Sequence, residues 1–328
     1  MKAQIIKSFG EADVFEAAEL ADPTPGAGEV VVKLGATSVN PVDWKLRRHG
    51  PAFAPELPAV LGCDIAGTVV SVGAGVTDFA AGDEVWGCGG GVNGMNGTYA
   101  EMISTDSALL ARKPASLSMR EAAALPLVTI TAWEGLERAG VGAGDTVLVH
   151  GGAGGVGHVV IQLAKALGAK VYATVSSDEK AAVARELGAD ETINYRTETV
   201  EAYVARLTNG RGFDAVYDAT GGSDVEASFE ATRVSGQVIS IVTQFEADLT
   251  TMHLKGLSLH VVFMLIPMLH NMDRAAQGTL MGAAATLCDA GKLKPLIDDE
   301  AFSLSQISAA HEKLEGGRAR GKIVIDIA

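Results

Sequence analysis

The sequence predicts a mixed α/β protein in which a small all-β barrel precedes a parallel, doubly wound sheet. In the first ~120 residues, short runs rich in Val and Ile are separated by Gly and Pro, a pattern typical of small barrels. From Asp145 onward, runs of strand length alternate with helical patterns, which is typical of a parallel sheet with helices on both faces. The 328 residues allow about two such domains.

The N-terminal region contains three predicted strands and ends in helices. The predicted strands are Ala27–Ser38, Val60–Gly73 and Gly82–Trp86. Ser118 and Glu121 have the spacing of a capping box, so a helix is expected to begin there. A second helical stretch is expected around Ala132–Ala139.

The rest of the chain alternates between the two patterns. The predicted strands are Thr146–His150, Lys170–Val175, Thr192–Tyr195, Phe213–Asp218, Gln237–Val242, Ser258–Phe263 and Lys322–Ile327. The predicted helices are Val156–Leu167, Glu179–Leu187 and Ala275–Ala290.

The amino-acid composition and charge argue against several classes of protein. Hydrophobic residues make up 48% and charged residues 20%, which excludes a disordered chain. Acidic residues outnumber basic ones by 40 to 26, and the resulting charge of −14 predicts no nucleic-acid partner. Cys63, Cys88 and Cys288 form no CxxC pair, which suits a reducing compartment. Without an apolar leader or spanning run, we expect a cytoplasmic protein that does not bind membranes.

A glycine-rich turn follows the strand at Val147–His150. Gly152, Gly154 and Gly157 form a GxGxxG pattern, and a helix with 3.6-residue apolar spacing comes next. Such glycines let the backbone approach a pyrophosphate, and the helix start offers unpaired amides to it. The alternative is a turn that binds nothing. The candidate cofactor-binding residues here are Gly152, Gly154, Gly155, Val156 and Gly157.

The end of the second strand of this sheet distinguishes NADPH from NADH. An NAD-binding protein usually places an acidic residue there, which accepts a hydrogen bond from the ribose 2′-hydroxyl. Here the strand ends in Ser176 and Ser177, and Asp178 comes two residues late. The two serines can donate to a 2′-phosphate and Lys180 can neutralise it. These residues favour NADPH, while the neighbouring acidic residues leave NADH open.

Several motifs together carry a family resemblance. The segment from Gly144 to Lys165 resembles the signature of the quinone oxidoreductase/zeta-crystallin family, within the medium-chain dehydrogenase/reductase superfamily. Segments elsewhere agree, in chain order: Ser38–Lys45, Pro58–Gly67, Gly82–Val85, Gly97–Glu101, Ile130–Ala132 and Arg320–Val324. The resemblance covers essentially the whole chain.

The resemblance implies an architecture and an assembly. It implies a GroES-like barrel domain from residues 1–122 and 266–328, with a Rossmann domain, residues 123–265, inserted between them. The nicotinamide would lie in the cleft between the domains. The family reduces quinones or the C=C bond of enones, usually with NADPH. It also implies a homodimer that pairs the edge strand Ser258–Phe263.

The resemblance also implies two catalytic residues. Lys45 matches the Lys of the family's Asn-Pro-Val-Asp-Trp-Lys motif, which approaches the cofactor or the substrate oxygen; the alternative is an exposed Lys on a short helix. Asn40 is expected either to contact the nicotinamide or substrate, or to cap the helix begun by Pro41. Asp43 is expected to be structural.

Four further residues are candidates for cofactor binding. By the same resemblance, Thr131 lies near the nicotinamide and Tyr195 packs beside the adenosine 2′-phosphate, unless they are a helix-interior Thr and a surface aromatic. Gly221 follows the fourth strand of the parallel sheet, where such sheets bind ligands. Arg320 reaches the cofactor from the C-terminal segment, or is a solvated charge.

The residues at the expected zinc-ligand positions distinguish this chain from the related zinc alcohol dehydrogenases. Asn40 stands where their first catalytic Cys is expected, and Cys63 and Asp64 stand where His and Glu are expected. We therefore predict an NADPH-dependent, zinc-independent oxidoreductase acting on a quinone or enone. The alternatives are a zinc-type alcohol dehydrogenase and a non-catalytic NADPH-binding sensor or structural subunit.

Overall fold

The structure, a computed structural model, describes residues 1–222 and 225–327 and contains two compact units. We call Met1–Leu127, Leu265–Gly291 and Pro295–Ala328 the antiparallel unit, and Val128–Met264 with Lys292–Lys294 the parallel unit. The domain boundaries at residues 122 and 265 stay predictions. No helix among the described residues is long and apolar enough to cross a membrane.

The antiparallel unit contains two sheets. The larger has seven strands in the order β15-β16-β3-β5-β6-β8, with β7 paired to β3. Its strands are β3 (Glu29–Val39), β5 (Asp64–Val72), β6 (Glu84–Cys88), β7 (Met102–Asp106), β8 (Leu110–Arg112), β15 (Phe302–Ser303) and β16 (Ile323–Asp326). The smaller contains β2 (Phe15–Glu19), β1 (Lys2–Ile6) and β4 (Ala59–Val60), in that order.

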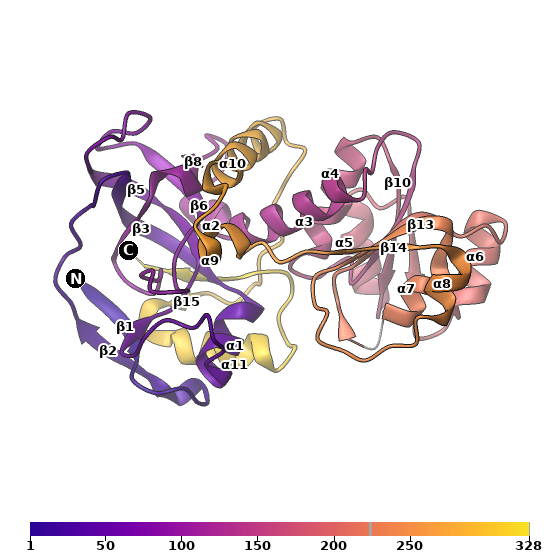
Figure 1. The fold of residues 1–328 in the computed structure, drawn as a ribbon, viewed down its shortest axis with the longest axis horizontal. Helices are drawn as coiled ribbons and strands as arrows, with labels where there is room; N and C mark the ends of the chain where they lie inside the picture. Colours follow the sequence, from indigo (N-terminus) through magenta and orange to yellow (C-terminus); the bar gives the residue numbers. More distant parts are fainter. Residues whose placement is uncertain (223–224, 328) are drawn as a thin grey trace. The chain divides into compact units, whose positions relative to one another are not determined.

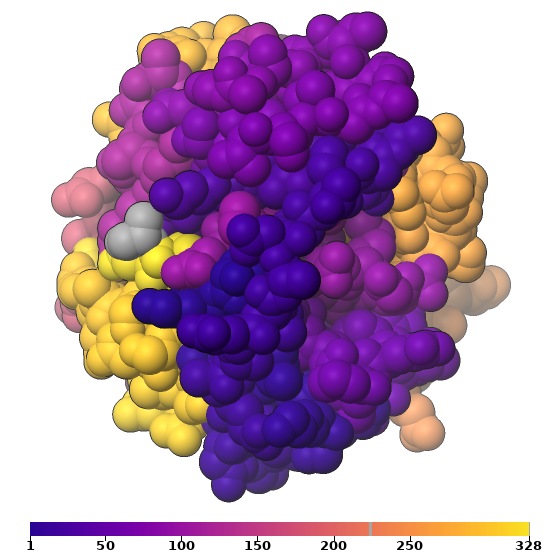
Figure 2. Space-filling view, turned by 90° about the vertical axis from the view of Figure 1, so that its left-hand side faces the viewer, coloured from indigo at the N-terminus to yellow at the C-terminus, as the bar shows by residue number. Residues whose placement is uncertain are grey.

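Both ends of the chain build this unit. Strand β16 pairs antiparallel with β3, placing Val324 opposite Ser38. Figure 2 shows the N-terminal residues, in indigo, beside the C-terminal segment, in yellow. The helices of the unit are α1 (Pro41–His49), α2 (Met119–Ala123), α9 (Ile266–His270), α10 (Arg274–Asp289) and α11 (Ile307–Glu315). Helix α1 packs against α11, so early and late segments share one interior (Figure 1).

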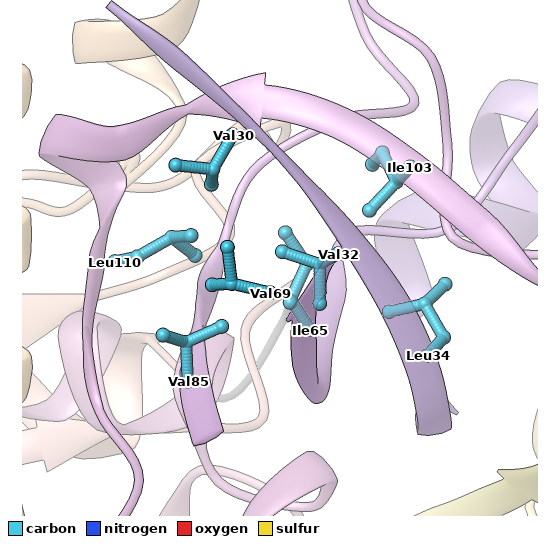
Figure 3. Packing of buried hydrophobic residues seen from close by; sticks show 8 residues of the cluster. All are labelled: Val30, Val32, Leu34, Ile65, Val69, Val85, Ile103 and Leu110. Carbon is cyan, nitrogen blue, oxygen red and sulfur yellow. The ribbon is translucent and has the colours of Figure 1, made fainter. Parts of the chain in front are cut away.

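Alternating residues of the central strands form the core of the larger sheet. From β3, every second side chain points inward, and neighbouring strands contribute Val and Ile to the same cluster (Figure 3). The cluster consists of Val30, Val32, Leu34, Ile65, Val69, Val85, Ile103 and Leu110. Each of them is at most 4% exposed. Burial at this level stabilises the unit by about 2 kcal/mol per side chain.

The parallel unit is built on six parallel strands in the order β11-β10-β9-β12-β13-β14. Numbered within the sheet, this order is 3-2-1-4-5-6, that of a Rossmann fold. The strands are β9 (Thr146–His150), β10 (Lys170–Val175), β11 (Glu191–Asn194), β12 (Phe213–Asp218), β13 (Thr232–Ser240) and β14 (Ser258–Val261). The helices are α3 (Pro126–Arg138), which begins in the antiparallel unit, α4 (Gly157–Ala166), α5 (Asp178–Glu186), α6 (Val200–Thr208), α7 (Val225–Ala231) and α8 (Thr250–Lys255).

The predicted fold class is confirmed, and most elements lie within two residues of their predicted bounds. The capping box forms: Ser118 N donates to Glu121 Oε2 over 2.8 Å, and Glu121 N donates to Ser118 Oγ over 3.2 Å. Strand β13 begins five residues earlier than predicted. Its first residues are polar, and a register shift interrupts their pairing with β12, so they carry no strand pattern in the sequence.

Candidate active site

The glycine turn after β9 is folded against the neighbouring strand β10. Gly151 has a φ of +71°, which favours glycine. Its amide donates to Thr174 Oγ1 over 3.3 Å, and the amide of Gly152 donates to the Thr174 carbonyl over 3.2 Å. Gly154 N then donates to the Gly151 carbonyl over 2.8 Å. The turn is therefore held by its own backbone and by β10.

Two glycines of the turn are required by close packing. A Cβ on Gly157 would lie 2.2 Å from the Gly151 carbonyl oxygen, and one on Gly152 would lie 2.7 Å from Ala173 Cβ. Both distances are far below ordinary contact. Helix α4 therefore starts directly over the turn because no side chain separates them.

The start of α4 presents unbonded amides. The N–H groups of Gly155, Val156 and Gly157 make no hydrogen bond to any part of the chain that the structure describes. Gly155 and Val156 are half-buried. The positive end of the ten-residue helix adds to this potential. The arrangement fits the pyrophosphate of a dinucleotide.

The turn lies at the switch point of the sheet, beside a second turn after β12. Asp218 Oδ1 accepts hydrogen bonds from Thr220 N over 3.0 Å and from Gly221 N over 2.8 Å. Gly221 has a φ of +74°. A Cβ on Gly151 would lie 2.9 Å from Thr220 Cγ2, so the two turns are neighbours. Asp218, which shapes the second turn, was not predicted; it lacks a recognisable motif.

The predicted 2′-phosphate residues lie at the carboxyl ends of β10 and β11. Val175 pairs with Asn194, which places Ser176 and Tyr195 at the same edge of the sheet. Ser177 Oγ accepts from Lys180 N over 3.3 Å and caps α5, and the Lys180 side chain is exposed. The adjoining Arg196 is also exposed and was missed by sequence reasoning, because it belongs to no motif.

Thr131 and Arg320 each contact residues of their own unit. Thr131 lies inside α3 and is 5% exposed, and its carbonyl accepts from Tyr217 Oη over 2.7 Å. Arg320 belongs to the antiparallel unit, where its amide donates to Asp298 Oδ2 over 2.9 Å. Its guanidinium lies 3.7 Å from Asp299. Their roles toward a cofactor stay predictions.

In the antiparallel unit, Asn40 begins α1 and is fully buried. Asn40 is the N-cap of this helix and forms a capping box with Asp43, whose carboxylate accepts from the Asn40 backbone N over 2.8 Å. The Asn40 side chain also donates from Nδ2 to Asp64 over 2.7 Å. Lys45, on the same helix, is half-buried, with its ammonium 5.8 Å from the centre of the Trp44 ring.

Asp43 also joins a buried chain of polar groups. Tyr99 Oη donates to Asp43 over 3.0 Å and lies 3.1 Å from His311 Nε2. Burial raises the pKa of Asp43 to about 6. Burial, with a smaller effect from Arg47, lowers the pKa of His311 to about 3, so this ring is neutral at neutral pH. Asp43 therefore joins the helix cap to this buried chain, and its structural role stays a prediction.

Asp64 is surrounded by donors. Its carboxylate accepts from Ser38 Oγ, from Leu127 N over 2.8 Å and from Asn40 Nδ2. Lys322 Nζ lies 3.5 Å from the same carboxylate and balances its charge. Asp64 is 0% and Lys322 3% exposed. Neither residue was predicted as part of a site, since they are 258 positions apart in the chain.

Comparisons with known proteins agree with this geometry. The alcohol dehydrogenase GroES-like domain matches residues 26–115, and the zinc-binding dehydrogenase domain matches residues 187–325. The 2-methylene-furan-3-one reductase of Solanum lycopersicum is 37% identical over 334 residues, which cover 99% of this chain and 79% of that protein. Two solved structures each align over the full length of both chains. An alcohol dehydrogenase superfamily protein from Novosphingobium aromaticivorans is 43% identical with a TM-score of 0.94, and the NADPH complex of Escherichia coli quinone oxidoreductase is 27% identical with a TM-score of 0.87.

The tomato relative is similar over almost the whole chain, and the switch point of the sheet carries unbonded amides. Together these two findings define the class of protein. The chain is an oxidoreductase of the medium-chain dehydrogenase/reductase superfamily. The chloroplastic NADPH-dependent alkenal/one oxidoreductase of Arabidopsis thaliana is 34% identical over 334 residues, which cover 99% of this chain and 79% of that protein. Within the superfamily, the chain belongs with the quinone oxidoreductase-like and alkenal/one oxidoreductase-like members.

The zinc named for one matching domain does not fit the residues present. Cys63 Sγ donates to Asp43 over 3.5 Å, and Asp64 is already balanced by Lys322. Across residues 1–222 and 225–327, no group of three or more His, Cys, Asp or Glu side chains is placed to hold a metal ion.

Proposed function

We propose that this protein is an NADPH-dependent, zinc-independent reductase of a quinone or of the C=C bond of an α,β-unsaturated carbonyl. The observation that carries the proposal is the row of unbonded amides at the start of α4, at the switch point of a Rossmann sheet. The names of the tomato reductase and the Escherichia coli quinone oxidoreductase, the latter with NADPH, support the substrate classes and the cofactor.

The residues of the parallel unit bind and orient the cofactor. The amides of Gly155, Val156 and Gly157 receive the pyrophosphate. Ser176 and Lys180 receive the 2′-phosphate, because no carboxylate ends β10 to compete for a ribose hydroxyl. Gly152, Gly154, Thr131, Tyr195, Gly221 and, from the antiparallel unit, Arg320 complete the proposed contacts.

Lys45, on α1, and Asn40, which directly precedes this helix, act where the hydride is transferred from the cofactor to the acceptor. When bound, NADPH supplies a hydride to the electrophilic carbon of the acceptor. The Lys45 ammonium stabilises the negative charge that develops on the acceptor oxygen, and Asn40 offers it a hydrogen bond. A proton from water or a polar side chain then completes the two-electron reduction.

The experiment is a parallel titration of the purified protein with NADPH and NADH, followed by NADPH oxidation with a panel of quinones and enones. We expect saturable binding, tighter for NADPH, and turnover on at least one acceptor. Binding without turnover on any acceptor favours the sensor or structural subunit. Alcohol oxidation that stops with a chelator favours the zinc-type dehydrogenase. If neither nucleotide binds, the proposal is wrong.

We also propose a cytoplasmic homodimer formed by pairing of β14. This strand ends the parallel sheet, and Val261 is 45% and Phe263 38% exposed beside it. An open strand edge with exposed apolar groups is suited to pairing with a second copy. Light scattering should find a dimer that Val261→Asp converts to monomer. Val70→Asp, at a valine 42% exposed on β5, is the matched control and should stay dimeric.

A further inference from the structure

Asn40, Asp64 and Lys322 form a closed ring of polar contacts inside the antiparallel unit. Asn40 Nδ2 donates to Asp64 Oδ2 over 2.7 Å, and Lys322 Nζ donates to Asn40 Oδ1. Lys322 Nζ also lies 3.5 Å from Asp64 Oδ2 and closes the ring. None of the three residues is more than 3% exposed. The amide of Asn40 thus bridges a buried carboxylate and a buried ammonium.

This ring allows only one orientation of the amide. Rotating it by 180° would place Oδ1 against the carboxylate and Nδ2 against the ammonium, and both contacts are repulsive in a buried site. The two charges cannot move aside easily. Ser38 Oγ and Leu127 N hold the carboxylate, and the carbonyl of Val39 accepts from Lys322 Nζ over 3.3 Å.

The locked orientation determines what Asn40 can offer to a ligand. An amide nitrogen carries two hydrogens, one of which is used by Asp64, and the amide oxygen faces Lys322. The second hydrogen on Nδ2 is the group left over. Because the side chain has no exposed surface here, a ligand atom reaches this hydrogen only after neighbouring groups shift.

We propose that Asp64 and Lys322 are positioning residues that lock Asn40 as a hydrogen-bond donor, so that the ligand group recognised at residue 40 is an acceptor oxygen. The ligand part of this inference rests on the proposed function, in which Asn40 contacts the nicotinamide or the substrate. Such an oxygen is present in the carbonyl of a quinone or enone, and it becomes more negative as hydride arrives.

The lock is tested by exchanging the two side chains. Asn40→Asp sets two carboxylates around one ammonium, and Asp64→Asn leaves that ammonium without a counter-charge. Each single variant should lower the melting temperature by roughly 10 °C. The double variant Asn40→Asp/Asp64→Asn restores one carboxylate, one amide and one ammonium, and should melt well above both single variants. Additive losses in the double variant would overturn the lock.

A pH series gives a second test of the ring if the single variants are strongly destabilised. In Asn40→Asp, two close carboxylates share a proton more readily than one alone, so the folded state binds protons more tightly than the unfolded state. The deficit in melting temperature relative to the wild type should therefore shrink as the pH falls from 8 to 5. A deficit that does not change with pH would count against the ring.

Measurements of kcat/KM distinguish a failure of the lock on Asn40 from a failure of the proposed function. In the double variant, residue 40 carries only acceptor oxygens, so kcat/KM for the acceptor should fall at least ~10-fold, the loss of one hydrogen bond to a charged group. A recovered melting temperature with unchanged kcat/KM would overturn the donor role at residue 40 and keep the lock. If the wild type binds no nucleotide and reduces no acceptor, the proposed function fails, and the melting series alone decides on the lock.

Discussion

The antiparallel and parallel units satisfy their polar groups in different ways. In the antiparallel unit, the buried side chains of Asp43, Asp64 and Lys322 are engaged by other groups of the same unit. In the parallel unit, the amides of the half-buried residues Gly155 and Val156 form no hydrogen bond within residues 1–222 and 225–327, at the start of α4. These three buried charges find their partners within their own unit, whereas the parallel unit leaves backbone donors that a ligand can use.

The difference follows from the cost of removing each kind of group from water. A buried carboxylate or ammonium without a partner costs several kcal/mol, so the chain must supply the partner itself. Backbone amides at a helix start can remain hydrated until an anion replaces the water. We therefore expect the parallel unit to be most sensitive to crowding of its backbone, and the antiparallel unit to changes of charge.

The largest effect is expected from crowding the glycine turn. In Gly157→Ala, the new Cβ would lie 2.2 Å from the Gly151 carbonyl oxygen, so α4 must shift away from the turn. Affinity for NADPH and NADH should both fall by ~100-fold or more, about 3 kcal/mol, in a fluorescence titration. Gly142→Ala, where a Cβ meets nothing within 4 Å, is the control and should bind normally. Normal binding by Gly157→Ala would contradict the role of the turn.

A charge effect of similar size is expected at Asp43. Its pKa lies at about 6 in the fold because of burial, so its contribution to stability is full below pH ~3.8 and is lost as the pH rises through 6. Asn has no such titration. Between pH 4 and 7, the unfolding free energy of Asp43→Asn should therefore gain about 2 kcal/mol relative to the wild type, measured by urea denaturation. The exposed control Asp13→Asn should show no such trend.

A smaller effect is expected where the cofactor's 2′-phosphate would bind. Lys180 is exposed, so its attraction to a phosphate is partly screened. Lys180→Ala should weaken NADPH binding by ~10-fold, or 1.4 kcal/mol, and leave NADH binding unchanged, which makes NADH the internal control. Equal losses for both nucleotides would remove Lys180 from the 2′-phosphate site.

The smallest effect is expected at Lys45. Its side chain is half-buried beside Trp44 and forms no ion pair within residues 1–222 and 225–327. Lys45→Ala should therefore melt like the wild type but lose several-fold, up to ~10-fold, in NADPH affinity or turnover. Lys33→Ala, at an exposed residue on β3, should match the wild type in both. Unchanged kinetics in Lys45→Ala would remove this residue from the site.

The sequence by itself determined the parallel unit in most of its detail. Strands β9 and β10 were predicted to the residue, because buried parallel strands are continuous apolar runs bounded by turns. The turn Gly151–Gly157 was predicted because all its requirements are local: a strand, glycines at close approaches, and a helix start.

Only the tertiary structure decided the polar interior of the antiparallel unit. Asp64 and Lys322 meet across 258 positions, and Tyr99 and His311 across 212. Asn40 was expected either to contact a ligand or to cap its helix; it is the N-cap of α1, in a capping box with Asp43, and its side chain also joins that long-range ring, which was not predicted. Local patterns record turns and helix starts because neighbouring residues make them. The partner of a buried charge is chosen by the packing of distant segments, which no local pattern records.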